Sequence, residues 1–198
     1  MKSEDAPVST ENQAIARYVA TVFGGTPRVR DYANESETQT VGILFCRDQP
    51  NEGITSYSTI RLSDHPMPWV SGEFPVRIEL AAMCVNPPDF FPEILASAAF
   101  SIIHSDSVYR PGTVMTNLVR RYDPSTALPH LYLTAPFPWG KALNTVDFGS
   151  KRVAWLFAIP ISESEYSYLK THGDDDFERM LEEQKTDFTN LERASLIQ

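Results

Sequence analysis

The chain has 198 residues, of which 42% are hydrophobic, 11% aromatic and 22% charged, and its formal net charge is −9. A chain of this length can bury one sizeable core without disulfides or a structural metal. The excess of acids argues against direct binding of nucleic acid, because proteins that hold phosphates normally show a basic face. The same charge suits a soluble protein that attracts a basic partner by long-range electrostatics.

Two features of the sequence bear on its compartment. Cys46 and Cys84 each lie inside an apolar run and lack CxxC or Cys/His neighbours, so we expect two buried, reduced thiols. The N-terminus has no apolar h-region, and no apolar run approaches the ~18 residues that span a bilayer. We therefore expect a cytoplasmic protein that makes no contact with a membrane.

The first third of the chain predicts a helix followed by strands. Residues 1–10 are polar and are predicted to form a disordered tail. Ser9 or Thr10 is a suitable cap for a helix whose apolar positions recur at helical spacing, and Gly24 and Gly25 favour its end. Strands are then predicted at residues 28–32, 40–46 and 54–62, with a hairpin loop at residues 51–53.

Residues 74–85 form the clearest strand, and a helix follows it. Arg77 and Glu79 fall on the same face of this strand, where they would either neutralise each other or line a polar groove. Asp89 is a good N-cap for a helix over residues 90–104, whose apolar side chains surround much of its circumference. We therefore expect that helix to pack deeply.

Two segments combine prolines with aromatic side chains, at residues 64–69 and 135–139. Stiff, extended backbone there would present Trp69, Phe137 and Trp139 to solvent, where such rings can anchor a partner. The alternative, which we favour, is that both segments fold back over the sheet and bury these rings.

The last fifth of the chain is the most informative part. A strand predicted at residues 153–160 leads into Ser162 and Glu165, which have the spacing of a capping box. Gly173 separates this helix from a second one that begins with three aspartates. From Ser162 to the end there are ten acids and four bases, a net charge of 4 − 10 = −6. These helices therefore carry most of the excess charge, either as a binding surface or as an ordinary solvated face.

The order of the elements, with a further strand at residues 130–134, predicts an α+β fold. We expect one mixed, largely antiparallel sheet with an N-terminal helix, a central packed helix and C-terminal helices. No internal repeat, low-complexity tract or linker divides residues 11–198, so a single domain is predicted.

No motif for catalysis, metal binding or a cofactor emerges. Ser63, Asp64 and His65 are the residue types of a hydrolase triad, but consecutive residues project away from one another, and there is no GxSxG elbow. The four histidines lack metal-binding spacing, and the glycines form no phosphate loop. A hydrolase or transferase using Asp64 and His65 remains a third hypothesis. Our prediction is a protein that is not an enzyme and has no metal or cofactor.

The segments with the most distinctive patterns are residues 76–80, 92–103, 155–165 and the closing Asp-Phe-x-x-Leu-x-Arg motif at 187–193. In this order they resemble the Suppressor of fused (SUFU) domain in its bacterial single-domain form, over about residues 12–195. Arg61 is a departure, since the family often has glycine at that turn. The resemblance implies a protein-binding domain. Eukaryotic relatives clamp a short peptide as an added strand, and bacterial relatives are immunity proteins that neutralise toxins, often nucleases.

We therefore predict a cytoplasmic immunity protein that binds a cognate toxin with a basic surface, such as a nuclease. The contacts are predicted on acids of the C-terminal helices, namely Glu163, Glu165, Asp174, Asp175, Asp176, Glu178, Glu182 and Glu183. The alternative is a regulatory module of the SUFU type that sequesters a partner by strand addition. The groove predicted for that alternative contains Tyr57, Arg77, Glu79 and Trp139. The sequence carries no signal for an oligomeric state.

Overall fold

The computed structural model describes residues 9–70 and 72–197. Its helices are α1 (Thr10–Phe23), α2 (Phe91–Ile103), α3 (Glu163–His172) and α4 (Asp174–Glu183), with short 3-10 helices η1 (Leu62–Asp64), η2 (Val119–Arg121) and η3 (Phe137–Ala142). Its strands are β1 (Pro27–Ala33), β2 (Thr40–Arg47), β3 (Ile54–Ile60), β4 (Pro68–Trp69), β5 (Gly72–Glu73), β6 (Arg77–Val85), β7 (Thr113–Met115), β8 (His130–Thr134), β9 (Val146–Asp147) and β10 (Arg152–Ile161).

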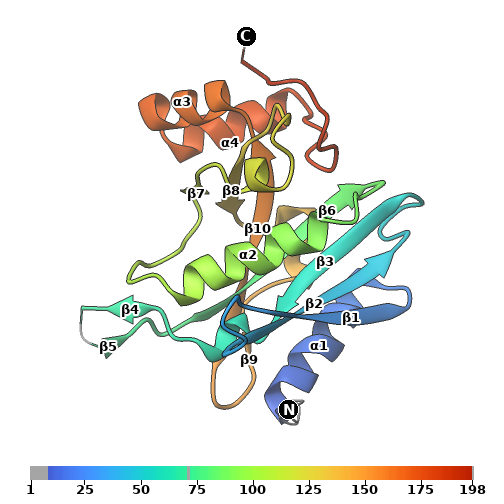
Figure 1. The fold of residues 1–198 in the computed structure, drawn as a ribbon, viewed down its shortest axis with the longest axis vertical. Helices are drawn as coiled ribbons and strands as arrows, with labels where there is room; N and C mark the ends of the chain where they lie inside the picture. The colour runs from blue at the N-terminus through green and yellow to red at the C-terminus, as the bar shows by residue number, and fades with distance from the viewer. Residues whose placement is uncertain (1–8, 71, 198) are drawn as a thin grey trace.

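Eight of these strands form one mixed sheet (Figure 1). The order across it is β1-β2-β3-β6-β10-β8-β7, and β9 pairs with β10 outside this path. Neighbouring strands are antiparallel except β6 and β10, which run parallel. β4 and β5 form a separate ribbon. The predicted α+β class is confirmed, with its largely antiparallel sheet, N-terminal helix, central helix and C-terminal helices.

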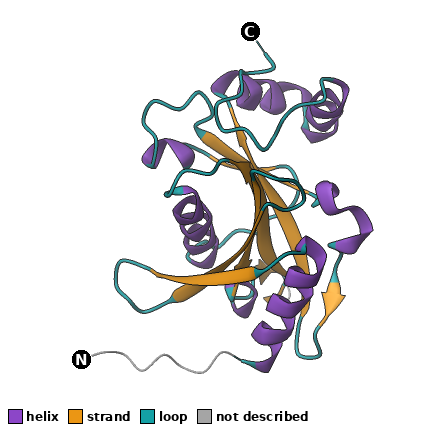
Figure 2. Cartoon of the chain, turned by 90° about the vertical axis from the view of Figure 1, so that its right-hand side faces the viewer, coloured by secondary structure: helices purple, strands orange, loops and turns teal. Residues whose placement is uncertain are grey.

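Helices cover both faces of this sheet (Figure 2). β10 shows the division, because successive side chains of a strand point to opposite faces. Leu156 belongs to the core beneath α2, whereas Trp155 packs with α1 and Phe157 with α4. The sheet therefore separates two apolar layers, and α1 shares with the α3–α4 pair the face opposite α2.

Most local predictions are confirmed, and one helix cap is not. The Ser9 hydroxyl accepts the Asn12 N–H at 3.1 Å and begins α1, which ends at Gly24 with a φ of +80°. α2 starts one residue later than predicted, with Phe90 at the cap position and no side-chain cap. The prediction that Asp89 caps this helix is therefore wrong. The start of α2 is stabilised instead by a proline in its first turn and by the deep packing of its apolar side chains.

Two boundaries also differ from the predictions. β3 ends at Ile60, because Arg61 adopts a left-handed φ of +82° and turns the chain into η1. The predicted tail covers residues 1–8, which lie outside the described residues, together with Ser9 and Thr10, which already belong to the cap and first turn of α1. The assignment of residues 11–198 to a single domain stays a prediction.

The two thiols behave as predicted. Cys46 and Cys84 are buried and free, and burial raises the pKa of Cys84 to about 12. Throughout residues 9–70 and 72–197, the helices are too short or too polar to cross a bilayer.

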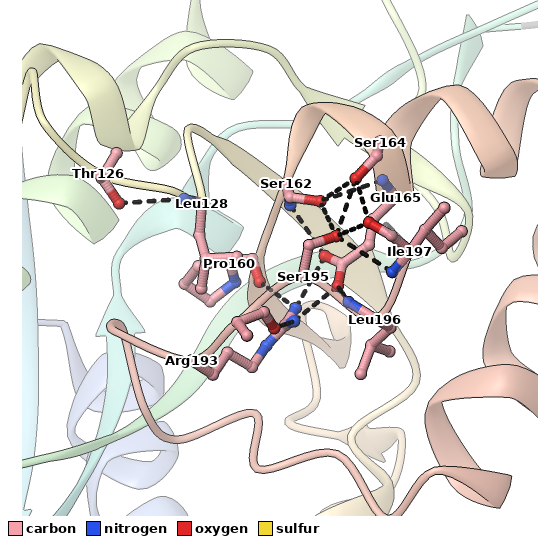
Figure 3. A network of polar contacts seen from close by, with 11 residues as sticks. Thr126, Leu128, Pro160, Ser162, Ser164, Glu165, Arg193, Ser195, Leu196 and Ile197 are labelled. Atoms are coloured by element: carbon pink, nitrogen blue, oxygen red, sulfur yellow. Dashed lines mark hydrogen bonds and ion pairs between the residues drawn. The ribbon is translucent and has the colours of Figure 1, made fainter.

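A buried ion pair joins the start of α3 to the C-terminal segment (Figure 3). The Arg193 guanidinium donates to both carboxylate oxygens of Glu165, at 2.6 and 2.9 Å, and to the Pro160 carbonyl at 3.0 Å. The N–H groups of Ser162 and Leu196 donate to the same carboxylate at 2.8 and 2.9 Å. The Ser162 hydroxyl accepts the Glu165 N–H in return, so the predicted capping box is confirmed.

The variant Arg193→Met should lose much of the free energy of unfolding. Methionine keeps apolar bulk but leaves the Glu165 carboxylate buried without its cation, a change that typically costs about 3–5 kcal/mol. Urea unfolding followed by circular dichroism measures the loss. Arg179→Met, which removes an exposed ion pair with Asp176, is the matched control and should cost less than about 1 kcal/mol. Equal losses in the two variants would contradict the assigned role of Arg193.

The same ion pair should make the fold sensitive to acid. Burial alone would raise the pKa of Glu165, but hydrogen bonds from Arg193 and from the backbone of Leu196 and Ser162 outweigh it and lower that pKa below its ordinary 4.5. The native state then binds fewer protons than the unfolded state. The stabilisation is complete above pH 4.5 and is lost as the pH falls through the lowered native pKa.

Urea unfolding at a series of pH values tests this expectation. Glu165→Gln should flatten the fall of stability below pH 4.5 relative to the unmodified protein, because glutamine does not titrate. If the free energy of unfolding falls with pH equally in the two proteins, acid unfolding is caused by carboxylates other than Glu165.

Candidate functional site

α4 places several acids beside its apolar anchor. Phe177 and Leu181 are buried and fix the helix against the sheet. Asp175, Glu178 and Glu182 follow one another at spacings of three and four residues, so they share one side of the helix. Acids in the first turn also suit the partial positive charge of a helix N-terminus.

A groove with a volume of about 580 Å³ lies between α4, η3 and the segment after α4. Its lining includes the acids Asp175, Glu178 and Glu182 and the rings of Phe137 and Phe188. Phe137 is 50% exposed and contacts Phe188 edge to face, with ring centroids 5.2 Å apart. The groove therefore combines carboxylates with aromatic rings, and aromatic side chains are enriched at protein interfaces.

Glu178 is the most firmly held acid of this groove. The Tyr132 hydroxyl donates to its Oε1 at 2.8 Å, and the Thr134 hydroxyl donates to the same oxygen. Burial, followed by the hydrogen bond to the negative Glu178, raises the pKa of Tyr132, so this phenol stays protonated and remains a donor. Two strand residues thus fix the orientation of a carboxylate on a helix.

The eight acids predicted as contacts fall into three groups. Three of them line the groove, as described above. Four others lie at least partly exposed elsewhere on α3 and α4, namely Glu163, Asp174, Asp176 and Glu183. Among these, Glu163 Oε2 contacts Nε2 of the buried His130 at 2.8 Å. The eighth, Glu165, is 0% exposed and bound internally by Arg193, so the prediction that it faces a partner is wrong.

The residues of the alternative groove are not brought together. Tyr57 is buried and packs against Phe91 of α2, with centroids 5.0 Å apart. Trp139 stacks on Phe23 of α1 at 4.9 Å, on the opposite face of the sheet. The predicted groove therefore does not form, because the sheet itself lies between two of its members.

Arg77 and Glu79 do not neutralise each other either. Arg77 donates to Glu73 at 2.7 Å. Glu79 is fully buried, where it accepts from the Thr59 hydroxyl and from the Ser63 N–H at 3.0 Å. Burial raises the pKa of Glu79 despite these hydrogen bonds. Both interpretations of this pair, mutual neutralisation and a polar groove, are therefore wrong.

The residues of the third hypothesis are engaged elsewhere. The Asp64 carboxylate is bound by the Lys151 ammonium and by the Asn12 amide at 2.7 Å. Burial lowers the pKa of His65, and in the described part of the chain no hydrogen bond links His65 to Ser63 or Asp64. Over the same residues, no cluster of three or more His, Cys, Asp or Glu could hold a metal ion. This arrangement supports no catalytic triad.

The two proline–aromatic segments differ from the favoured expectation of burial. Trp69 is 49% exposed on the β4–β5 ribbon, beside an almost fully exposed Val70, and Phe137 is half exposed in the groove. Trp139 is partly buried between α1 and Phe157. The expectation is therefore wrong for Trp69 and Phe137, and right in part for Trp139.

Sequence reasoning assigns no functional role to Lys185, Thr186 and Phe188, which complete the groove. They follow α4 in a segment without periodic pattern, so no local rule places them near η3. The signal that could have found them is the Asp-Phe-x-x-Leu-x-Arg motif, because its arginine is the residue that ties this segment to Glu165.

Comparisons with known proteins agree with the resemblance. The family model described as Suppressor of fused protein (SUFU) matches residues 37–194. The chain is 38% identical over 190 residues to the immunity protein YqcF of Bacillus subtilis (strain 168), a match that covers 96% of this chain and 99% of that relative.

Two solved structures share the fold at low sequence identity. A SUFU homologue from Neisseria gonorrhoeae FA 1090 gives a TM-score of 0.74 at 18% identity, covering 95% of this chain and 97% of that one. Drosophila Suppressor of Fused gives 0.64 at 12% identity, covering 92% of this chain and 50% of that one. With the family model matching most of its length, this chain belongs to the Suppressor of fused (SUFU) family.

Proposed function

We propose that this protein is an immunity protein, which binds a cognate toxin and blocks its action without turnover. The relative from Bacillus subtilis bears the name of an immunity protein, and the match spans nearly the whole of both chains. Membership of the SUFU family supports a protein-binding domain. The structural observation that carries the proposal is the groove beside α4, which three carboxylates line together with a half-exposed aromatic ring.

The proposed mechanism is occlusion of a basic surface. A nuclease toxin needs such a surface to hold phosphates. The C-terminal helices and the segment after them, with a net charge of −6, draw that surface in by long-range attraction. Phe137 then supplies an apolar contact at short range. We place this encounter in the cytoplasm, where the toxin would meet its target.

Co-expression tests the proposed function directly. If a neighbouring gene encodes a toxin domain, its product is the candidate, and growth should be rescued when both proteins are produced. The two proteins should co-purify, and the intact mass of the toxin should be unchanged, which separates binding from enzymatic inactivation. Growth arrest despite full expression of this protein would overturn the proposal.

Charge reversal in the groove should slow association with the toxin. The double variant Asp175→Lys with Glu182→Lys removes the attraction, so the association rate at low salt should fall on the order of tenfold and depend less on salt. Stopped-flow or surface plasmon resonance measures both. Glu37→Lys with Asp106→Lys is the control, since these exposed acids lie in the β1–β2 turn and after α2. If both double variants slow association equally, the net charge of the protein and not the groove would determine the association rate.

One observation favours the alternative of a peptide-sequestering module. β1 is an edge strand of the sheet, and a hollow of about 520 Å³ lined by Arg30, Arg47 and Tyr57 lies next to it. The double variant Arg30→Glu with Arg47→Glu should leave toxin neutralisation intact if α4 is the contact site. Loss of partner binding in this variant, with the groove variants unaffected, would favour strand addition at β1.

A further inference from the structure

We infer that the groove beside α4 receives the side chain of an arginine that projects from the partner protein. The inference rests on the proposed function and specifies the chemistry that the partner must present at this place. Three features of the groove carry it: an oriented carboxylate, an aromatic corner, and the distribution of charge along the rim.

The first feature is the carboxylate of Glu178. Its Oε1 accepts hydrogen bonds from the hydroxyls of Tyr132 and Thr134. Tyr132 is 0% exposed, so its ring is fixed in the core and orients the carboxylate. Its Oε2 has no donor among the described residues and is left to accept from a ligand. A carboxylate fixed in this way favours the directed N–H groups of a guanidinium.

The second feature is an aromatic corner in the same groove as the acids. The rings of Phe137 and Phe188 stand at 89° to each other, and Leu181 completes the apolar lining. Such a surface covers the methylene stem of a long basic side chain. A planar guanidinium also stacks on an exposed ring, which a compact, strongly hydrated lysine ammonium does less well. The corner therefore favours arginine.

The third feature is the balance of charge around the groove. Arg179 is held by Asp176 at 2.6 Å, which neutralises it on the helix surface. The side chain of Lys185 makes no ion pair or hydrogen bond among the described residues. The groove lining sets three carboxylates against two cations, Arg179 and Lys185, a formal balance of 2 − 3 = −1. The groove thus favours a cation, and Lys185 is the group that an incoming arginine must displace.

A titration of the full-length protein with N-acetyl-arginine amide tests the ligand chemistry. N-acetyl-citrulline amide is the matched control, because it has nearly the same shape without the charge. The arginine probe should produce saturable shifts of the Glu178 and Thr186 amide signals in ¹H–¹⁵N spectra. The citrulline probe should have a dissociation constant higher by about tenfold or more, which corresponds to a loss of about 1.4 kcal/mol or more in binding free energy. Equal responses, or no response to the arginine probe, would overturn the inference.

Variants locate the site within the helix. Glu178→Gln preserves the shape and the hydroxyl contacts but removes the charge, so it should weaken the arginine probe about tenfold. Glu183→Gln, on the same helix but outside the groove, should leave it unchanged. Should Glu178→Gln fail to fold, Asp175→Asn with Glu182→Gln removes charge from the exposed rim and should weaken the probe in the same direction. Unchanged affinity in the folded groove variant would refute the assignment.

Lys185→Ala tests whether the Lys185 ammonium competes with the ligand or helps to bind it. If the groove takes a cation, removing the competing ammonium should tighten the arginine probe. Weaker binding would mean that Lys185 contributes to holding the ligand, and the inference would be wrong.

Toxin assays separate this inference from the proposed function. If Glu178→Gln neutralises the toxin as well as the unmodified protein does, the arginine inference fails and the immunity function stands. If the unmodified protein neutralises no toxin but still binds the arginine probe in the groove, the immunity proposal fails and the ligand chemistry stands.

Discussion

The buried ion pair between Glu165 and Arg193 determines how the C-terminal part of this molecule is built. Arg193 also binds the Pro160 carbonyl at the end of β10, and Glu165 also binds the backbone of Leu196. A single contact thus joins the sheet, the start of α3 and the last residues of the chain. The segment between α4 and Arg193 has no regular secondary structure of its own. This tie holds its end, and the Val85 N–H holds its middle by donating to the Thr189 carbonyl at 3.0 Å. Thr186 and Phe188 of the groove lining belong to that segment.

Glu165 and Glu178 show why acidity alone does not identify a binding residue. Both are glutamates of the C-terminal helices, and both are oriented by several hydrogen bonds. The partner of Glu165 is an internal cation that uses both oxygens, so its charge is cancelled inside the fold. The partners of Glu178 are neutral hydroxyls on one oxygen, so its charge remains available to the groove. The difference lies in the partner and not in the residue type.

The sheet separates the two surfaces that remain candidates for partner binding. The groove of α4 lies on the face shared with α1, and the hollow beside Tyr57 lies on the face covered by α2. A partner that covers one surface leaves the other uncovered, because the two lie on opposite faces of the sheet. The two surfaces are therefore separate candidates for docking, and the chemistry of each would decide which class of partner it takes.

The sequence by itself determined the local structure of this protein and its family. The Ser9 cap, the Ser162–Glu165 capping box and the acidic start of α4 were predictable, because capping and periodicity act within a few residues along the chain. Burial, pairing and the groove itself were decided only by the tertiary structure. Arg193 is 28 residues from Glu165, and Thr134 is 44 residues from Glu178. No local pattern encodes contacts across such separations, since they depend on which distant segments the folded sheet brings together.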